Sequence, residues 1–204
     1  FDAYCALIET PEGAAERNEM LAALTTNVTR FFREPHHFEH LRRSMGPQLI
    51  EAAKSGARVR LWSAACSSGE EPYSIALTLL DICSEIARRD VRILATDIDL
   101  YGEDAVAPIA QPMRVRWLSV DRSGAEKMWR VKDEARALIT FKELNLIGEW
   151  PMRGRFDVIF CRNVVIYFEE DTQAFLWRRF KDMLTPDGRL YIGHSERIDV
   201  PGYV

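Results

Sequence analysis

The fold of this 204-residue chain is decided by one stretch, LWSAACSSGEEPYSI, which runs from Leu61 to Ile75. Its first residues are apolar and predict a short strand, and a polar loop follows them. Pro72 then opens an apolar run at helical spacing, because proline is tolerated in the first turn of a helix. A strand that leads through a polar loop into a helix is a building unit of an α/β sheet. In open sheets of this kind, ligands bind where the strands end and the helices begin.

The same alternation continues along the chain. Apolar runs predict further strands at 91–97, 156–161 and 189–193. Helical spacing predicts helices within 1–26 and at 35–50, 72–82 and 171–184. Strands that alternate with helices indicate a parallel, doubly wound sheet that is covered on both faces. Two short apolar runs, 130–132 and 138–141, predict a small antiparallel lobe.

Composition excludes several classes of protein. The chain is 47% hydrophobic and 28% charged, which is ordinary for a globular domain. Its 27 basic and 31 acidic residues give a net charge of −4 without a basic block, so we expect no nucleic-acid partner. No apolar run approaches the roughly 20 residues that a membrane span needs, so no membrane insertion is expected. The four cysteines are scattered without a C-x-x-C pair, which favours a reducing, cytoplasmic location.

The loop after the first strand is the first candidate for a ligand site. It carries a single glycine and two carboxylates, Glu70 and Glu71, in place of the G-x-G-x-x-G of a pyrophosphate site. Carboxylates there would repel a phosphate and attract a cation. The same pair would also serve as a helix cap, since acidic side chains stabilise a helix N-terminus by ~0.3–1 kcal/mol.

Asp97 ends the next predicted strand, at a position from which an acidic side chain accepts hydrogen bonds from ribose hydroxyls. Asp97 and Glu71 together therefore fit an adenosine-bearing ligand that carries positive charge and no phosphate. S-adenosylmethionine (SAM) is such a ligand.

Two more polar clusters lie at the expected loops. Arg162 and Asn163 end the strand 156–161, shortly before Tyr167. The segment 25–35 alternates polar and aromatic residues just ahead of a helix. A helix cap and a buried phenylalanine pair account for much of that segment, but not for Asn27, Thr29 and Arg33 together.

These and further runs of the sequence are similar to those of a known protein family. The chain resembles the CheR family of chemotaxis protein-glutamate methyltransferases, in the order TTNVTRFFREP (25–35), LWSAACSSGEEPYSI (61–75), ATDID (95–99), Asn145-Leu146, FDVIFCRNVVIYF (156–168) and PDGRLYIGHSE (186–196). The resemblance implies a class I SAM-dependent methyltransferase, an α/β Rossmann-like fold with a doubly wound sheet. It also implies a small N-terminal helical region with a linker at 1–50, and a methyltransferase domain at 51–204 with an antiparallel β-subdomain inserted at about 105–143.

The chain departs from the family pattern in three places. Only one helix of the N-terminal domain is recognisable, in residues 1–8. About ten residues that form a crossover helix in the family are absent after Asp99, and the chain stops before the family's last strands finish. We therefore expect the N-terminal region to be truncated and a segment to be missing after Asp99.

The resemblance also implies roles for single residues. Asn27, Thr29 and Arg33 would reach over the methionine part of SAM, Glu71 would hold its charged end and Asp97 its ribose. Adenine would lie beside Asn145 and Leu146, and Arg162 and Asn163 would lie near the other face of the donor. Tyr167, Arg33 and Arg162 would orient the acceptor oxygen near the reacting methyl group.

The reaction that the resemblance implies is methyl transfer from SAM to glutamate side chains of chemoreceptors, which leaves γ-methyl esters and S-adenosylhomocysteine (SAH). The implied partners are the cytoplasmic helices of transmembrane chemoreceptors, and the enzyme is expected to be a monomer. Basic residues that would meet an acidic receptor surface are Arg42, Arg43, Arg130 and Lys132. Two alternatives stay open: a regulatory module that binds SAM, SAH or another ligand without transfer, and a methyltransferase for a small carboxylic acid.

Histidine chemistry is the rival interpretation. His36 and His40 lie one helical turn apart and could hold a metal ion, but no carboxylate motif completes the set and we expect no metal. His194-Ser195-Glu196 suggests a hydrolase, yet the chain lacks a G-x-S-x-G nucleophile elbow. That trio is instead expected to close the edge of the sheet.

Overall fold

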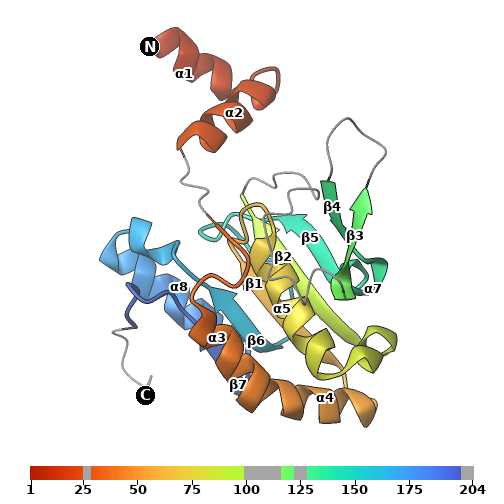
Figure 1. Ribbon diagram of the computed structural model, residues 1–204. Helices are drawn as coiled ribbons and strands as arrows, with labels where there is room; N and C mark the ends of the chain where they lie inside the picture. Colours follow the sequence, from red (N-terminus) through yellow and green to blue (C-terminus); the bar gives the residue numbers. More distant parts are fainter. Residues whose placement is uncertain (25–28, 99–115, 122–127, 199–204) are drawn as a thin grey trace.

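A computed structural model describes residues 1–24, 29–98, 116–121 and 128–198 of the chain. At its centre lies a five-stranded parallel sheet in the order β5-β2-β1-β6-β7 (Figure 1). The strands are β1 (Val59–Ala64), β2 (Val91–Asp97), β5 (Ile139–Glu143), β6 (Phe156–Cys161) and β7 (Leu184–Tyr191). The predicted parallel, doubly wound sheet is therefore confirmed.

The order of the strands creates a crevice beside β1. From β1 the chain proceeds outward through β2 to β5, whereas β6 and β7 lie on the other side of β1. The connections after β1 and β6 therefore leave the sheet in opposite directions. At such a switch point the loops at the carboxyl ends separate, and a ligand can bind between them.

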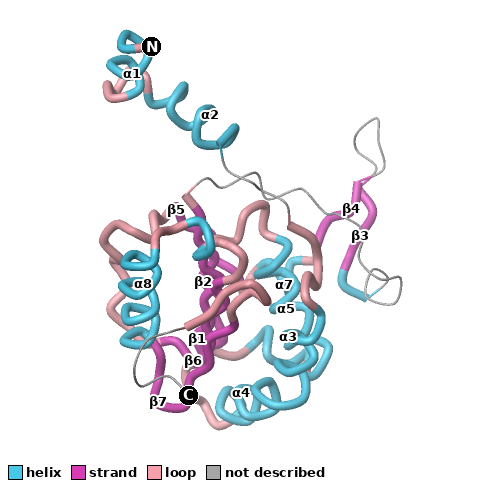
Figure 2. Tube along the Cα trace, turned by 90° about the vertical axis from the view of Figure 1, so that its left-hand side faces the viewer, coloured by secondary structure: helices cyan, strands magenta, loops and turns pink. Residues whose placement is uncertain are grey.

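Neighbouring residues of a strand point to opposite sides of the sheet. Helices cover both sides, so both faces are buried. On β1, Leu61 packs in one hydrophobic cluster and Trp62 in another, and both side chains are fully buried. Helix α8 (Glu170–Met183) covers the face of Trp62. The face of Leu61 is covered by α5 (Glu70–Ile82), α3 (Pro35–His40) and α4 (Gly46–Lys54) (Figure 2).

The helix expected at 35–50 forms and continues to Lys54. A π-helical turn, η1 (Leu41–Met45), joins α3 to α4. The side chains of its first and last residues, Leu41 and Met45, are buried. Two helices precede α3 in the chain, α1 (Asp2–Ile8) and α2 (Ala14–Leu24). They contact each other through Arg17, which donates to the Ile8 carbonyl at 2.8 Å, and α1 buries none of its residues.

The antiparallel lobe differs from its prediction. A two-stranded sheet joins β3 (Leu118–Asp121) and β4 (Met128–Val131) in antiparallel register. The second run assigned to the lobe is β5, which pairs in parallel with β2 and so belongs to the main sheet. The boundary expected at about 143 therefore includes a strand of the central sheet. Short helical turns complete the described chain: η2 (Ser84–Arg88), α7 (Asp133–Arg136) and η3 (Val165–Tyr167).

The connection at which we expect missing residues lies in 99–115, outside the described residues. Within the described part of the chain, none of the helices combines the length and the apolar character that crossing a membrane requires.

We predict that a buried hydrogen bond on β1 is a main determinant of stability. The indole Nε1 of Trp62 donates to Thr96 Oγ1 at 2.8 Å, and both side chains are buried. Thr96→Val should lower the free energy of unfolding by about 1–3 kcal/mol, because it leaves a buried donor without an acceptor. Thr96→Ser, which keeps the hydroxyl, should be less destabilised in urea unfolding. Equal stability of Thr96→Val and wild type would contradict this.

Candidate functional site

A cavity of about 420 Å³ opens at the carboxyl ends of β1, β2 and β6. Its volume suits a small-molecule ligand, since such sites typically measure about 300–1,000 Å³. The residues predicted for the site that line this cavity are Thr29, Arg33, Glu71, Asp97, Asn145, Leu146, Arg162, Asn163 and Tyr167. Asn27 lies outside the described residues. The segments that form these walls lie far apart in sequence, so the fold brings the predicted site residues together.

Backbone strain concentrates in the loops around the cavity. Among the described residues, the non-glycine positions with positive φ are Phe32, Glu34, Ala65, Ser67 and Asn163. Each lies in or directly beside a loop that lines the cavity. Such conformations cost of order 1–3 kcal/mol each and persist where the surroundings impose them. The loops are therefore held in shape by their neighbours.

Gly69 begins α5 with φ of 99°, a conformation that L side chains rarely adopt. A Cβ there would lie 3.3 Å from the ring of Phe141. Gly69, the single glycine of this loop, therefore supplies the left-handed backbone conformation with which the chain turns into α5.

The carboxylate of Glu71 faces the cavity and is held from two sides. Ser63 Oγ donates to Oε1 at 2.7 Å, and Arg162 Nη1 donates to Oε2 at 3.0 Å. Burial raises the pKa of Glu71, and the Arg162 guanidinium and the Ser63 hydrogen bond oppose that rise. Glu71 lies in the first turn of α5, as the capping interpretation expected, but its oxygens bond to β1 and to the loop after β6.

Asp97 lies at the end of β2 and orders the loop after β1. Its Oδ2 accepts the backbone N–H of Ser67 at 2.6 Å. A carboxylate at a strand end, beside the loop of the neighbouring strand, is the arrangement that suits a ribose diol.

The opposite wall of the cavity is largely apolar. It includes Leu144, Leu146 and Ile147, in the loop after β5. The Leu146 carbonyl fixes this loop by accepting bonds from Trp150 Nε1 at 3.1 Å and Arg179 Nη1 at 3.0 Å. Tyr167 lies at the mouth, with 66% of its surface exposed. A flat apolar group can therefore bind against one wall while polar groups meet the carboxylates of the other.

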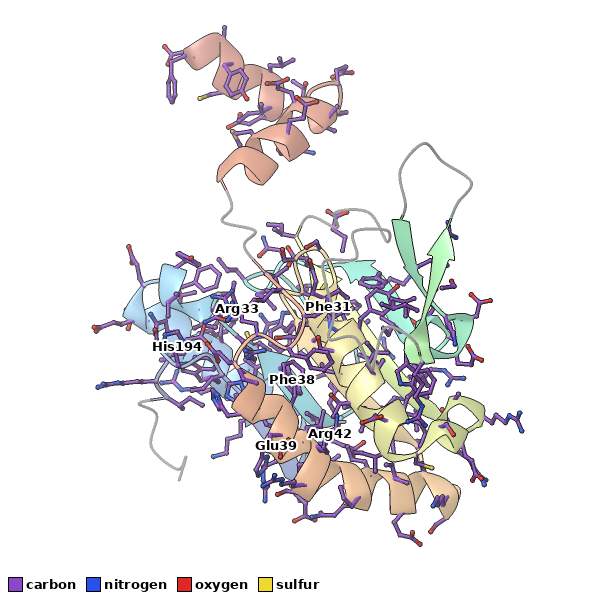
Figure 3. The ribbon with its side chains drawn as sticks, viewed as in Figure 1. Phe31, Arg33, Phe38, Glu39, Arg42 and His194 are labelled. Carbon is purple, nitrogen blue, oxygen red and sulfur yellow. The ribbon has the colours of Figure 1, made fainter. Side chains whose placement is uncertain are left out.

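The segment 29–34 forms a further wall. Phe31 and Phe38 are buried in the core near this segment (Figure 3). The Phe32 N–H donates to Ser74 Oγ at 2.9 Å, and the Arg33 carbonyl accepts Arg162 Nη2. These contacts place the Arg33 side chain along the cavity.

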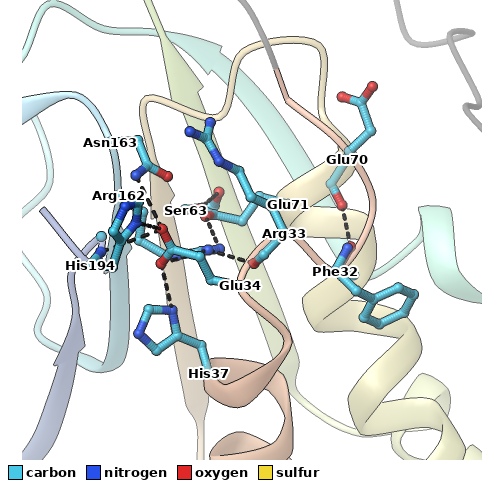
Figure 4. A network of polar contacts seen from close by, with 12 residues as sticks. Phe32, Arg33, Glu34, His37, Ser63, Glu70, Glu71, Arg162, Asn163 and His194 are labelled. Carbon is cyan, nitrogen blue, oxygen red and sulfur yellow. Dashed lines mark hydrogen bonds and ion pairs between the residues drawn. The ribbon is translucent and has the colours of Figure 1, made fainter.

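Arg162 is almost entirely buried, with 2% of its side chain exposed. Besides Glu71 it forms an ion pair with Glu34, at 3.2 Å between Nη2 and Oε2 (Figure 4). Its guanidinium lies 5.6 Å from the centre of the Phe38 ring. Arg162 lines the cavity as predicted, but its guanidinium forms ion pairs with the carboxylates of Glu34 and Glu71.

Sequence reasoning missed Glu34 and understated Glu196. The buried carboxylate of Glu196 accepts the backbone N–H groups of Val164, Val165 and Gly193 at 3.0, 2.8 and 2.5 Å. It therefore shapes the loop that carries Asn163; its expected role in closing the edge of the sheet stays a prediction. The sequence signal for it was its place directly after the strand, in His194-Ser195-Glu196.

One member of the histidine pair considered as a rival metal site has another partner. His40 Nδ1 lies 2.8 Å from the Tyr191 hydroxyl. Ligand atoms of His36, His37 and Glu34 do lie within 4.8 Å of one another. Burial and the nearby Arg162 lower the pKa of His37 to about 4, and the guanidinium beside Glu34 disfavours a second cation there. The absence of a metal stays a prediction.

A doubly wound sheet with one acidic side chain in the helix turn after β1 and another at the end of β2, and no phosphate-binding glycine loop in the described chain, defines a class I SAM-dependent methyltransferase. Comparison with known proteins agrees. Residues 27–203 match the family model "CheR methyltransferase, SAM binding domain". The chain therefore belongs to the CheR methyltransferase family.

Curated relatives carry matching names. A probable chemotaxis protein methyltransferase of Rhizobium etli is 52% identical, over 97% of this chain and 78% of the relative. Chemotaxis protein methyltransferases of Klebsiella aerogenes and Escherichia coli are 40% and 37% identical, over 96% of this chain and 69% and 70% of the relatives. A solved structure of PKMT2 from Rickettsia typhi with AdoHcy aligns with 74% of this chain and 25% of that one, at 12% identity and a TM-score of 0.40.

SAM is thus the cofactor of this chain, and the relatives support SAM-dependent methylation in chemotaxis. The residues present fit the cofactor. Two carboxylates suit its cationic and ribose groups, apolar side chains suit its adenine, and the described loops offer no glycine cradle for phosphate.

We predict that Glu34 stabilises the fold in a pH-dependent manner. Burial alone would raise its pKa, but hydrogen bonds from His194 and Asn163 and the charge of Arg162 lower it from 4.5 to about 2. A lowered folded-state pKa stabilises the protein above the unfolded value, and this contribution disappears as the pH falls towards 2. Glu34→Gln should therefore lower the free energy of unfolding at pH 7 by on the order of 2 kcal/mol.

The difference between wild type and Glu34→Gln should shrink by about half between pH 7 and pH 3, in urea unfolding at each pH. A difference that stays constant over this range would contradict the lowered pKa. Glu51→Gln, on the exposed side of α4, is the control that should show little effect at either pH.

Proposed function

We propose that the chain transfers the methyl group of SAM to glutamate side chains of chemoreceptors and forms γ-methyl esters. The observation that supports this most directly is that Glu71, in the helix turn after β1, and Asp97, at the end of β2, line one cavity in a CheR-family domain. The names of the relatives support a substrate within chemotaxis. The glutamate acceptor rests on the family resemblance.

Each wall of the cavity is assigned to one part of the donor. Glu71 holds the charged methionine end, since its carboxylate lines the cavity from the first turn of α5 and is held there by Ser63 of β1. Asp97 accepts the ribose hydroxyls, and Asn145 and Leu146 flank adenine on the apolar wall. Thr29 and Arg33 cover the methionine part from the segment ahead of α3. Asn163 lies on the remaining side, beside Arg162.

The chemistry needs alignment more than proton transfer. Bound SAM supplies a methyl group on a positively charged sulfur. A glutamate carboxylate has a reference pKa near 4.3 and is ionised at neutral pH, so no general base is required. The protein must hold the carboxylate oxygen in line with the methyl and sulfur atoms, and alignment of this kind can contribute ~7–11 kcal/mol.

Tyr167 is the leading residue for orienting the acceptor, because it lies at the exposed mouth of the cavity. Arg33 lines the cavity from the opposite segment and presents a cation to the carboxylate. Arg162, whose guanidinium is engaged by Glu71 and Glu34, is assigned a positioning role beneath the reacting groups.

The donor assignment is tested by calorimetric titration with SAM and SAH. Asp97→Asn keeps an acceptor oxygen for the Ser67 N–H but lacks the carboxylate that a ribose diol requires. We expect micromolar binding by the wild type and at least about tenfold weaker binding by the variant, about 1.4 kcal/mol. Glu51→Gln should bind normally. Unchanged affinity of Asp97→Asn would overturn the ribose assignment.

The acceptor assignment is tested with SAM labelled in its methyl group and chemoreceptor fragments from the same source. Methyl esters release methanol in mild alkali, whereas methylated amines do not. We expect alkali-labile label on the receptor, lost when its methylated glutamates are replaced by glutamine. Normal donor binding without transfer to any receptor would favour the alternative of a regulatory SAM-binding module.

A further inference from the structure

Residues 29–34, here called the strap, are held beside the cavity by bonds from two other elements. Three residues of the strap line the cavity: Thr29, Arg30 and Arg33. The Phe32 N–H donates to the hydroxyl of Ser74 on α5 at 2.9 Å. One residue further on, the Arg33 carbonyl accepts a hydrogen bond from Arg162 (Figure 4). Consecutive residues of this wall are thus fixed by bonds from distant parts of the fold.

The hydroxyl of Ser74 makes two hydrogen bonds at once. It donates to the Glu70 carbonyl one turn earlier at 2.6 Å, a bond that serine inside a helix can make. A hydroxyl has one donor but two acceptor lone pairs, so it can also accept the Phe32 N–H. Ser74 is fully buried, so the protein and not water supplies the partners of its hydroxyl. The bond within α5 therefore orients the hydroxyl that holds the strap.

The strap depends on such bonds because its backbone is strained. Phe32 and Glu34 have φ of 54° and 56°, in the left-handed region that residues other than glycine rarely adopt. Conformations of this kind persist where the surroundings impose them. The Phe32 ring packs against Phe38, with 5.3 Å between ring centres, and the bond to Ser74 holds the backbone of the same residue. Loss of that bond should therefore let the strap leave its place more often.

We propose that Ser74 is a positioning residue for the donor, because its hydroxyl fastens the strap beside the methionine part of the bound ligand. The inference rests on the proposed donor site, in which Thr29 and Arg33 cover that part. SAM and SAH share the amino-acid group that lies there, so the strap should contribute to the binding of both. The coupling is reciprocal: a ligand that contacts the closed strap must also stabilise its closure.

The test compares Ser74→Ala with a matched variant, Thr78→Val. Thr78 lies one turn further along α5, is equally buried and donates its hydroxyl to the Ser74 carbonyl at 2.7 Å. Thr78→Val replaces this hydroxyl by a methyl group and leaves the bond between Ser74 and the strap in place. Both variants lose a buried hydroxyl of the same helix, but only Ser74→Ala removes the acceptor of the Phe32 N–H.

Opening of the strap is measured by limited digestion with trypsin, which cleaves after Arg30 and Arg33, and the cut sites are identified by mass spectrometry. The rate of cleavage follows the population of the open form. Ser74→Ala should be cut in the strap about fivefold faster than wild type, since the lost bond shifts that population. Sites elsewhere, such as the exposed Arg178 on α8, should keep their rates, and Thr78→Val should match wild type. Saturating SAH should slow cleavage of the strap in Ser74→Ala.

Calorimetry with SAM and with SAH then tests whether the strap positions the donor. Ser74→Ala should bind both ligands at least about threefold more weakly, because only the fraction of the protein with a closed strap is competent to bind. Thr78→Val should bind both ligands as wild type does.

Unchanged affinities in folded Ser74→Ala would overturn the proposal, and so would cleavage of the strap that saturating SAH does not slow. Faster cleavage across the whole chain would also overturn it, since a merely structural role predicts that result. If Ser74→Ala fails to fold, Ser74→Cys replaces it, because a thiol is a much weaker acceptor than a hydroxyl. A wild type that binds neither ligand would overturn the donor site itself, whereas normal binding by wild type and Ser74→Ala alike would leave that site standing.

Discussion

The arrangement of the site depends on one buried cation, the guanidinium of Arg162 at the end of β6. Burying a guanidinium costs several kcal/mol unless ion pairs and hydrogen bonds compensate it. Compensation comes from Glu71 on α5 and from Glu34 and the Arg33 carbonyl ahead of α3. The charge is therefore satisfied only when three distant segments have assembled, and these segments form three walls of the cavity. Folding of the domain and formation of the cavity are coupled through this residue.

The sheet contributes the second constraint, because it fixes where the loops begin. The carboxyl ends of β1, β2 and β6 lie side by side, and parallel pairing sets their register, so the loops that follow must share one crevice. The strained residues in these loops are held by long-range bonds, of which Asp97 to the Ser67 N–H is one. A site with this preorganisation has little conformational entropy left to lose when a ligand binds. That property suits an enzyme that works by alignment.

Several of the residues that sequence analysis expected in the site, and that line the cavity, share a simple property: they lie in or beside loops that follow strands, and strands are visible as apolar runs. Glu71, Asp97 and Asn163 could be found in this way. Glu34 could not, because its partners Asn163 and His194 are 129 and 160 residues away, and no local pattern records them. The assignment of β5 failed for a related reason. A short half-buried strand has the same pattern in a lobe as at the edge of a parallel sheet, and only its pairing with β2 distinguishes the two.

The carboxylates of Glu71 and Asp97 in the cavity raise a question for an anionic acceptor, and the cations of the lining offer an answer. Arg30 and Arg33 also line the cavity, and Arg30 is exposed, so a carboxylate that enters from solvent meets cations there. In the proposed reaction, bound SAM adds a positive charge at sulfur, whereas after transfer the sulfur is neutral and so is the ester. The attraction between acceptor and donor thus weakens in the same step. Electrostatics would then favour approach of the acceptor before the transfer and departure of the methyl ester after it, without any titrating residue.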